Sequence, residues 1–358
     1  MFGRVVLVAV LALYAARQAS TYRLRTAVDG LRRLSTLPRA DVDACLAAYE
    51  YLSNGTSTLA STGPRDVAVE TAHVRAYYAV ANEVLAVADI EKMYIPPQVL
   101  PEEGLYANQL VWEERVFEAL ALRPGARRLL DVGCGRGRVA HHASTHLDAD
   151  VDGFNVDAAQ IEHAVRWANA TGRSDRLRFR VGDHHQRFAW PDATFDGVYS
   201  FQAIWPFFRE LDGVAKELFR VLKPGARYVG SEYLLTPNFD RRNPRHLELH
   251  RLFLPTLAAT QSNTPADVEG ALLRAGFEVL RSAPSDAPAW PLTDQKTDLF
   301  QNMRTVARGA HWLGLAPEWV EQLLSNFLKG GEAWAEAEKA KLADLNWQLV
   351  ARKPERDV

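Results

Sequence analysis

Three glycines follow an acidic residue in the string Asp131-Val132-Gly133-Cys134-Gly135-Arg136-Gly137. The apolar residues before this string and the pattern that starts at Arg138 predict a buried strand, a tight turn and the N-terminus of a helix. Glycine lets a ligand approach the backbone N–H groups of such a turn closely. A dinucleotide-binding fingerprint would need a glycine where Arg138 stands, so the spacing disfavours hydride transfer.

The segments after this turn continue in a regular order. A strand is predicted over 151–156 and a helix over 158–171, and a further strand over 177–181 ends at Gly182-Asp183-His184. A fourth strand is predicted over 195–200, and a helix that ends near Lys223-Pro224-Gly225 leads into a fifth. This alternation of strands and helices predicts a doubly wound α/β sheet.

With these segments in this order, the chain resembles class I S-adenosylmethionine (SAM) methyltransferases. The resemblance implies that the glycines make room for the methionine part of SAM and that Asp131 contacts its ammonium group. Asn155 stands where the family binds the ribose, and an amide can both donate to and accept from a diol. Asp183 stands where the family binds the adenine amino group. The residues implied to bind SAM are Tyr78, Asp131, Gly133, Cys134, Gly135, Gly137, Asn155, Val156, Gln160, Asp183, His184 and Gln202.

Farther along, the resemblance narrows to sterol 24-C-methyltransferases and covers residues 74–354. It rests on segments such as Ser231-Glu232-Tyr233-Leu234-Leu235-Thr236 and Ala275-Gly276-Phe277-Glu278-Val279. It also implies an extra helical region over about 291–341. The expected fold is therefore a Rossmann-like methyltransferase sheet with a C-terminal helical insertion or cap and an N-terminal membrane-associated helix.

Two segments depart from the sterol family. Residues 89–97 replace an aromatic and glycine-rich stretch, and residues 202–207 replace an acidic residue followed by a small-Cys-His string. Both segments touch the substrate or its reacting end in that family. The altered 202–207 segment is compatible with a phenolic acceptor as an alternative to a sterol.

Methylation of an alkene carbon has its own physical requirements. A neutral C=C that attacks the sulfonium methyl leaves a carbocation, so the site needs a dry cavity, aromatic faces and a base. The chain carries 9 Trp, 11 Tyr and 15 Phe. We expect Glu232 to act as the base, with Tyr78 and Trp205 facing the developing cation.

No metal is expected. The pairs His184-His185 and His141-His142 resemble metal-binding pairs, but the sequence offers neither a completing carboxylate at helix spacing. We interpret these histidines as solvated or capping residues. The two cysteines, Cys45 and Cys134, match no zinc spacing and no disulfide framework.

The N-terminus differs from the rest of the chain. Residues 1–40 carry seven arginines and one aspartate around the uncharged run 5–16. As a helix this run would rise about 18 Å, which is short of the roughly 30 Å hydrocarbon core of a bilayer. We interpret it as an anchor that lies in one leaflet, with a transit peptide or a signal peptide as alternatives. The expected localisation is the cytosolic face of a membrane, with the endoplasmic reticulum favoured.

Four segments are expected along the chain: an anchor or targeting segment over 1–25, a linker with a short helix over 26–65, the SAM-binding core over 66–236 and a sterol methyltransferase-like region over 237–354. The net charge of −2 and the pI of about 6.6 disfavour a nucleic-acid partner.

The predicted function is SAM-dependent methylation of carbon in an apolar isoprenoid lipid, with a sterol side chain as the preferred acceptor. Two alternatives remain open. One is a small-molecule O-, N- or ring-C-methyltransferase for a phenolic (tocopherol-like) or amine substrate. The other is a non-catalytic, membrane-tethered SAM-binding protein.

Overall fold

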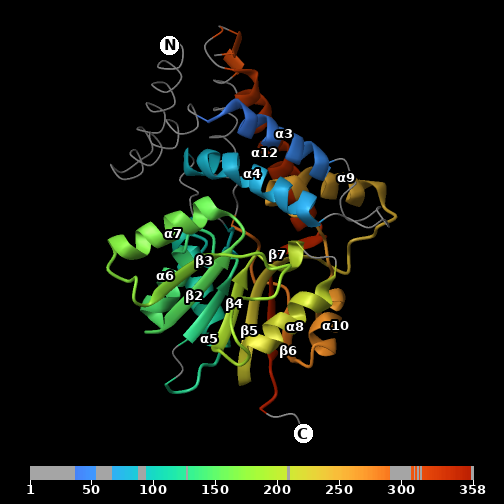
Figure 1. Cartoon of the computed structure of the whole chain (residues 1–358). Helices are drawn as coiled ribbons and strands as arrows, with labels where there is room; N and C mark the ends of the chain where they lie inside the picture. Colours follow the sequence, from blue (N-terminus) through green and yellow to red (C-terminus); the bar gives the residue numbers. More distant parts are fainter. Residues whose placement is uncertain are drawn as a thin grey trace. The chain divides into compact units, whose positions relative to one another are not determined.

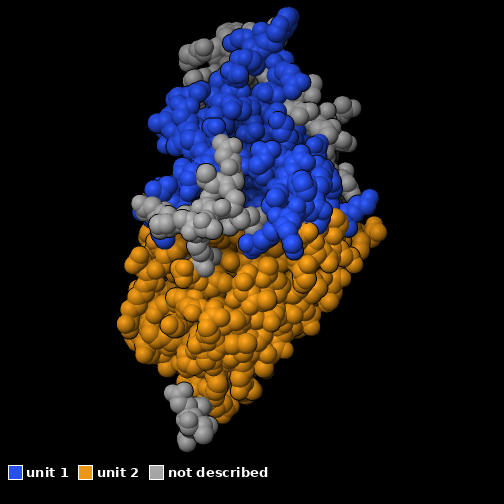
Figure 2. Space-filling view, turned by 90° about the vertical axis from the view of Figure 1, so that its right-hand side faces the viewer, with its two compact units in different colours: residues 1–93, 241–260, 291–339 blue, residues 94–240, 261–290, 340–358 orange. Residues whose placement is uncertain are grey.

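The computed structural model describes residues 37–53, 67–87, 94–125, 128–207, 210–290, 308–309, 311–312, 314 and 317–355. The chain divides into two compact units, which are coloured separately in Figure 2. Unit 1 comprises residues 1–93, 241–260 and 291–339, and unit 2 comprises residues 94–240, 261–290 and 340–358. Each unit joins segments that are distant in the sequence. The expected division of the chain into four consecutive segments stays a prediction.

Unit 2 contains a seven-stranded sheet in the order β3-β2-β1-β4-β5-β7-β6 (Figure 1). The first five strands of this order run parallel to their neighbours, and β7 pairs antiparallel with both β5 and β6. This confirms the predicted doubly wound sheet. The strands are β1 (Arg128–Val132), β2 (Asp150–Asn155), β3 (Leu177–Val181), β4 (Phe195–Phe201), β5 (Leu222–Leu235), β6 (Glu278–Ala283) and β7 (Ala343–Arg352).

Helices of unit 2 connect and cover these strands. Successive parallel strands run outward from β1 in one direction through β2 and β3, and in the other through β4 and β5. Because such crossovers are right-handed, α6 and α7 cover one face of the sheet and α8 covers the other. The helices are α5 (Leu105–Ala119), α6 (Arg138–His146), α7 (Ala158–Ala170), α8 (Leu211–Val221) and α10 (Pro265–Arg274), with a short 3-10 helix, η1 (Trp205–Phe207).

Local sequence explains where these elements begin and which surfaces they bury. Strand β1 is buried on both faces, and its Leu129, Leu130 and Val132 are completely buried, as expected for a central parallel strand. Helix α7 begins after Asp157, whose Oδ1 accepts hydrogen bonds from the N–H groups of the second and third helical residues at 2.8 and 3.3 Å.

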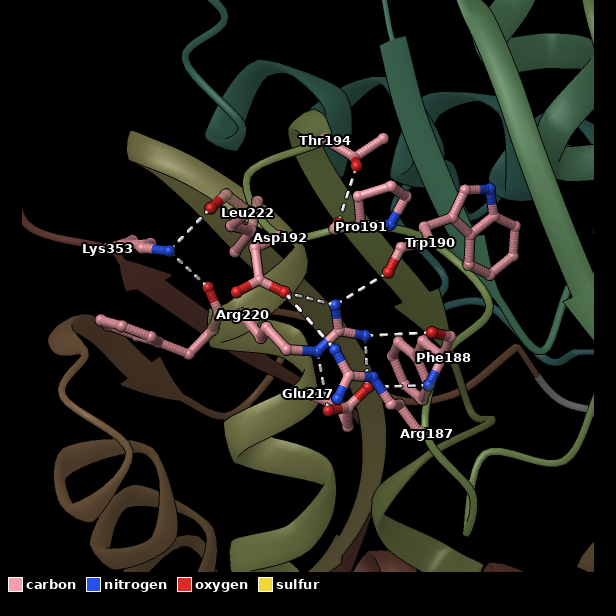
Figure 3. A network of polar contacts seen from close by, with 11 residues as sticks. Arg187, Phe188, Trp190, Pro191, Asp192, Thr194, Glu217, Arg220, Leu222 and Lys353 are labelled. Carbon is pink, nitrogen blue, oxygen red and sulfur yellow. Dashed lines mark hydrogen bonds and ion pairs between the residues drawn. The ribbon is translucent and has the colours of Figure 1, made fainter.

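A network around Arg220 attaches α8 to the segment between β3 and β4 (Figure 3). The guanidinium donates to the backbone oxygens of Phe188 and Trp190 at 3.0 and 2.8 Å, and it pairs with Glu217 at 2.7 Å. Glu217 in turn accepts from the N–H of Phe188 at 2.7 Å. These bonds satisfy the backbone of a long connection that has no secondary structure of its own.

Unit 1 is helical in its described part. Tyr49 and Tyr77 donate hydroxyl hydrogen bonds to the backbone oxygens of Asn326 and Thr256, each at 2.8 Å. A Cβ on Gly330 would lie 1.9 Å from Cγ2 of Thr256, so glycine is needed there for close packing. Unit 1 contains α3 (Arg39–Ser53), α4 (Val67–Val87), α9 (Pro244–Phe253), α12 (Glu318–Lys339) and a short 3-10 helix, η2 (Leu254–Leu257).

Within the described ranges, no helix combines the length and the apolarity needed to cross a membrane. The membrane-associated helix predicted over 1–25 lies outside the described residues, as does most of the first half of the predicted helical region over 291–341. The second half of that region contains α12, whose 22 residues confirm a helix there.

Candidate active site

The glycine turn between β1 and α6 has left-handed backbone angles at Gly133, Gly135 and Gly137, with φ values of 75°, 54° and 82°. A Cβ on Gly133 would lie 2.4 Å from the side chain of Ala203, and one on Gly137 would lie 2.9 Å from side chains of both α7 and β3. On Gly135 a Cβ would meet only Oε1 of Gln160, at 3.5 Å, among the described residues. Two glycines therefore serve packing within the protein, and Gly135 alone of the three has room for a Cβ at ordinary contact distance.

Cys134 lies between these glycines and is buried. Its N–H donates to the backbone oxygen of Phe154 at 3.1 Å, and a Cβ on Gly153 would lie 2.9 Å from its own Cβ. Burial raises the pKa of the Cys134 thiol well above its usual value, so the thiol is neutral. The structure thus places Cys134 in the packing between β1 and β2, and its predicted contact with SAM stays a prediction.

Asn155 and Gln160 meet beside Gly135. The amide of Asn155, at the end of β2, donates to Oε1 of Gln160 at 2.7 Å, and Gln160 is buried on α7. Asn155 and its neighbour Val156 are partly exposed. The glycine turn, the end of β2 and the first turn of α7 therefore bring four of the predicted SAM-binding residues together.

Asp131 is a buried carboxyl group on β1, two residues before the first glycine of the turn. Its side-chain oxygen Oδ2 has no hydrogen-bond partner within the part of the chain that the structure describes. Burial raises the pKa of Asp131 to about 8; the nearby Tyr199 hydroxyl offsets part of this rise, although it does not complete a hydrogen bond of ordinary geometry. A cationic ammonium group would supply the missing donor. The unpartnered carboxylate oxygen at the end of β1 therefore fits the ammonium group of the methionine part of SAM.

Asp183 follows β3 and is oriented by His185. Its Oδ1 accepts from the N–H of His185 at 2.9 Å and lies 3.0 Å from Nδ1 of that imidazole. The hydrogen bond from His185 lowers the pKa of Asp183 to about 2, so this carboxylate is ionised at neutral pH. Desolvation, followed by the charge of His185, lowers the pKa of His184 to about 3. The end of β3 thus presents an ionised acceptor beside a neutral imidazole.

Gln202 follows β4 and has a left-handed φ of 50°. Its side-chain amide donates to the backbone oxygens of Ile95 and Leu345 at 2.9 and 3.0 Å, and its own N–H donates to Ser231 at 2.8 Å. Gln202 therefore connects three segments of unit 2. Its predicted contact with SAM stays a prediction.

Glu232 lies on β5 and is completely buried. Ser200 donates to one carboxylate oxygen at 2.5 Å, and the N–H groups of Ala203 and Ile204 donate to the other at 3.0 and 3.3 Å. Burial raises the pKa of Glu232 to about 7, and these hydrogen bonds offset part of the rise. In the described structure Glu232 fixes the turn after β4, since both of its oxygens are occupied.

Trp205 continues the same buried network. Its indole N–H donates to the hydroxyl of Tyr228 at 3.0 Å, and that hydroxyl lies 2.9 Å from Oγ of Ser200. Because the indole can only donate and Ser200 donates to Glu232, the chain of donors runs from Trp205 through Tyr228 and Ser200 to Glu232. The network brings two of the three predicted catalytic residues together.

Tyr78, the third predicted catalytic residue, lies in unit 1 on α4. It is partly buried, and its ring packs edge to face against Tyr77 with centroids 5.3 Å apart. Its proposed contacts with SAM and substrate stay predictions.

Sequence reasoning missed a buried network at the N-terminus of α6. Glu113 accepts from Arg138 Nη1 at 3.0 Å and from the hydroxyl of Tyr94 at 2.7 Å, and it lies 2.7 Å from Nδ1 of His142. Burial raises the pKa of Glu113, but the charge of Arg138 and the hydrogen bonds outweigh it, and the net shift is downward. Arg138 was the residue in the sequence that could have indicated this network. It directly follows the glycine turn, and an arginine that packs there needs an acidic partner.

The fold and the comparisons with known proteins define the class of protein. Residues 129–225 match the family described as a methyltransferase domain. The solved structure of the cyclopropane synthase MmaA2 from Mycobacterium tuberculosis has a TM-score of 0.57 and 16% identity, and the likeness covers 74% of this chain and 90% of that chain. The chain is a class I SAM-dependent methyltransferase, and SAM is its co-substrate.

Curated relatives define the family more narrowly. The sterol 24-C-methyltransferase erg6 of Aspergillus fumigatus is 34% identical over 267 residues, which cover 68% of this chain and 70% of the relative. The sterol 24-C-methyltransferase ERG6B of Gibberella zeae is 31% identical over 271 residues and covers the same shares. The chain therefore belongs to the sterol 24-C-methyltransferase family.

Proposed function

We propose that this enzyme transfers the methyl group of SAM to a carbon atom of an apolar isoprenoid lipid, with a sterol side chain as the preferred acceptor. The observation that carries the proposal is the identity of 31–34% to sterol 24-C-methyltransferases over 68% of the chain. A 24-methylenesterol C-methyltransferase from Oryza sativa, 31% identical over 62% of this chain, acts by its name on a related acceptor.

In the proposed reaction, SAM supplies an electrophilic methyl group when it is bound. Asp131 pairs with the ammonium group, the amides of Asn155 and Gln160 bind the ribose hydroxyls, and Asp183 accepts from the adenine amino group. The unpartnered Oδ2 of Asp131 and the ionised state of Asp183 support these roles. The new C–C bond forms as the bond from sulfur to methyl breaks, and the resulting cation loses a proton.

Glu232 is proposed to receive that proton. Its pKa of about 7 is well matched to a base at neutral pH. Because its oxygens are occupied, the proton would pass through the hydroxyl of Ser200, which already donates to Glu232. Tyr78 and Trp205 are proposed to stabilise the cation with their aromatic faces.

The acceptor is tested with purified protein and SAM labelled in its methyl group, against a panel of sterols, linear triterpenes and prenylated phenols. We expect label in sterols. Label only in the phenols would favour the phenolic alternative, for which the altered segment 202–207 leaves room, and would overturn the sterol proposal.

The catalytic roles are tested on the same panel with two variants. Glu232→Gln should bind SAM and lipid but lose turnover, as expected when a group acts mainly in the transition state. Trp205→Leu should lower turnover on a sterol, whereas a phenolic acceptor, which forms no carbocation, would leave turnover nearly intact.

We further propose that residues 1–25 attach the enzyme to the cytosolic face of a membrane, with the endoplasmic reticulum favoured. The arginines that flank the uncharged run 5–16 support attachment to an anionic surface. Full-length protein should sediment with membranes, whereas a deletion that starts at Thr36 should stay in the supernatant and retain activity on detergent-dispersed substrate. Recovery of intact full-length protein entirely in the supernatant would contradict this proposal.

A further inference from the structure

Two histidines and a glutamate gather between α5 and α6 in unit 2. His142 and His146 are four residues apart on α6, so their rings lie on the same side of the helix. Glu114 comes from α5, and its Oε1 lies 3.8 Å from Nε2 of His142 and 3.7 Å from Nδ1 of His146. Their ligand atoms all lie within 4.8 Å of one another. The side chains are 16%, 38% and 41% exposed for His142, His146 and Glu114, so a solvated ion can reach them.

The buried carboxylate of Glu113 orients one of these histidines. Arg138 pairs with both oxygens of Glu113, which keeps the group a carboxylate that can only accept hydrogen bonds. Nδ1 of His142 lies 2.7 Å from this carboxylate and therefore carries the hydrogen. The other ring nitrogen, Nε2, lies 3.8 Å from Oε1 of Glu114 and is the atom that an ion would meet. A carboxylate behind a histidine in this way is the usual support of a metal-binding imidazole.

Packing limits how the two rings can move. The ring of Phe117 lies edge-on to His142 with centroids 5.4 Å apart, and it also contacts His146 at 6.2 Å. A site whose ligands are already held loses less side-chain entropy when an ion binds.

We propose that Nε2 of His142, Nδ1 of His146 and Oε1 of Glu114 bind a divalent transition-metal ion, with Zn²⁺ as the best match. Two imidazoles and one carboxylate suit zinc, whereas calcium and magnesium prefer oxygen ligands alone. Zinc bonds of about 2.0–2.2 Å require ligand atoms roughly 3.3–3.5 Å apart. The two separations from Glu114, 3.8 and 3.7 Å, approach this value, and the ligand atoms of the two histidines, which lie within 4.8 Å of each other, would move closer by side-chain rotation.

The spacing of residues along a single helix does not indicate this site, because its ligands come from two helices. The carboxylate that the histidines of α6 lack at helix spacing is supplied by α5, and the pair that matters is His142 and His146 rather than His141 and His142. The site stands apart from the methyl-transfer chemistry, because its ligands are none of the residues assigned to SAM or to the acceptor.

An ion at this site would link α5 to α6. Through His142 and Glu113 the ion would also help to position Arg138, which is the first residue of α6 and the neighbour of Gly137 in the glycine turn. We therefore expect zinc to stabilise the fold against heat, and the methyl transfer itself to proceed without it.

The test uses the full chain without an affinity tag, stripped of metal by a chelator and titrated with Zn²⁺ alone in a calorimeter. We expect the wild type to bind with a melting temperature that rises with the zinc concentration. His146→Ala and Glu114→Gln should each weaken binding at this site by about 10-fold or more. His141→Ala is the matched control, since His141 lies on the same helix but outside the cluster, beside Thr171 and Trp167.

Three results would overturn the proposal: no zinc binding by the wild type, unchanged binding in His146→Ala and Glu114→Gln, or an equal loss in His141→Ala. Asp183, His184 and His185 form a second group whose ligand atoms lie within 4.8 Å. Zinc bound to this second group would still bind in His146→Ala and Glu114→Gln and would be lost in His185→Ala. A second zinc ion bound there leaves the proposed site unchanged, because only the ion at the proposed site depends on His146.

Discussion

The carboxyl ends of β1, β2 and β3 differ from the ends of β4 and β5 in how their polar groups are satisfied. We call the ends of β1, β2 and β3 the first edge and the ends of β4 and β5 the second edge. At the first edge, Oδ2 of Asp131 has no partner among the described residues, and Asn155 and Asp183 remain partly exposed. At the second edge, both oxygens of Glu232 and the side-chain amide of Gln202 are occupied by bonds within unit 2. The first edge is built to receive a polar ligand, and the second is held by its own hydrogen bonds.

This difference has a physical reason. A cofactor with an ammonium group, a diol and an amino group is recognised by polar protein atoms that are unpaired or exposed before it binds. When the cofactor binds, hydrogen bonds to it compensate for the burial of these atoms. An apolar acceptor offers no such bonds, so polar groups near it must be satisfied by the protein itself. The comparison predicts that substitutions at the first edge change SAM affinity strongly and that substitution of Glu232 at the second edge changes it little.

The largest expected effect on SAM affinity is at Gly135. Gly135→Val would put a side chain beside Oε1 of Gln160, where the cofactor is expected to lie, and we expect SAM to bind about 100-fold more weakly, equivalent to roughly 2.7 kcal/mol. Calorimetry measures this. Gly172→Val is the matched control, because Gly172 also has a left-handed φ, of 65°, with nothing within 4 Å, and lies in the turn after α7. Equal SAM affinity in both variants would show that the cofactor does not cover Gly135.

The next effect is a pH dependence that originates at Asp131. Its pKa of about 8 means that the free protein holds this group protonated near neutral pH, whereas pairing with an ammonium requires the carboxylate. SAM binding should therefore release a proton, and affinity should rise about 10-fold per pH unit between about pH 5.5 and 7.5. Calorimetry in two buffers with different heats of ionisation measures the released proton. Asp131→Asn should bind weakly with no such dependence, and a flat wild-type profile would contradict the assignment.

The effect at Asp183 should be similar to that at Gly135 at most. Asp183→Ala removes the acceptor proposed for the adenine amino group, and SAM affinity should fall by about 1–3 kcal/mol. Asp183→Asn keeps an acceptor oxygen and should lose less. Since the pKa of Asp183 is lowered to about 2, its contribution should be constant above about pH 4, in contrast to that of Asp131. Unchanged SAM affinity in Asp183→Ala would reduce Asp183 to a turn residue that positions His185.

The sequence predicted the fold best where a residue type or an apolar pattern is typical of one local structure. The strand over 177–181 was predicted to the residue, and the turn at Gly133–Gly137 lies at the predicted end of β1. It was less informative about partners. Nothing in the string around Gly133 indicates that it makes room for Ala203, and nothing near Glu232 indicates that Ser200, Ala203 and Ile204 occupy its oxygens. Such pairings depend on strand neighbours that are distant along the chain.

The smallest expected effect on SAM affinity is at Glu232, where a different property changes instead. The pKa of Glu232 is raised from an ordinary 4.5 to about 7, so the folded state favours the protonated form. Its contribution to stability is fully present below about pH 4.5 and is lost as pH rises through 7, by about 3 kcal/mol. Glu232→Gln is neutral at every pH and keeps an oxygen that can accept from Ala203 and Ile204. Its stability, measured by urea unfolding, should therefore fall less than that of the wild type between about pH 5 and 8.

The same variant sharpens the contrast between the two edges. Asp131 titrates in the same direction, but it is present in both proteins, so the difference between their pH profiles isolates Glu232. SAM affinity in Glu232→Gln should stay within about twofold of the wild type, because the substitution touches none of the groups assigned to SAM. A loss of SAM affinity as large as that of Asp183→Ala, with the fold intact, would mean that the end of β5 belongs to the cofactor pocket, and the division between a ligand-binding edge and a self-satisfied edge would fail.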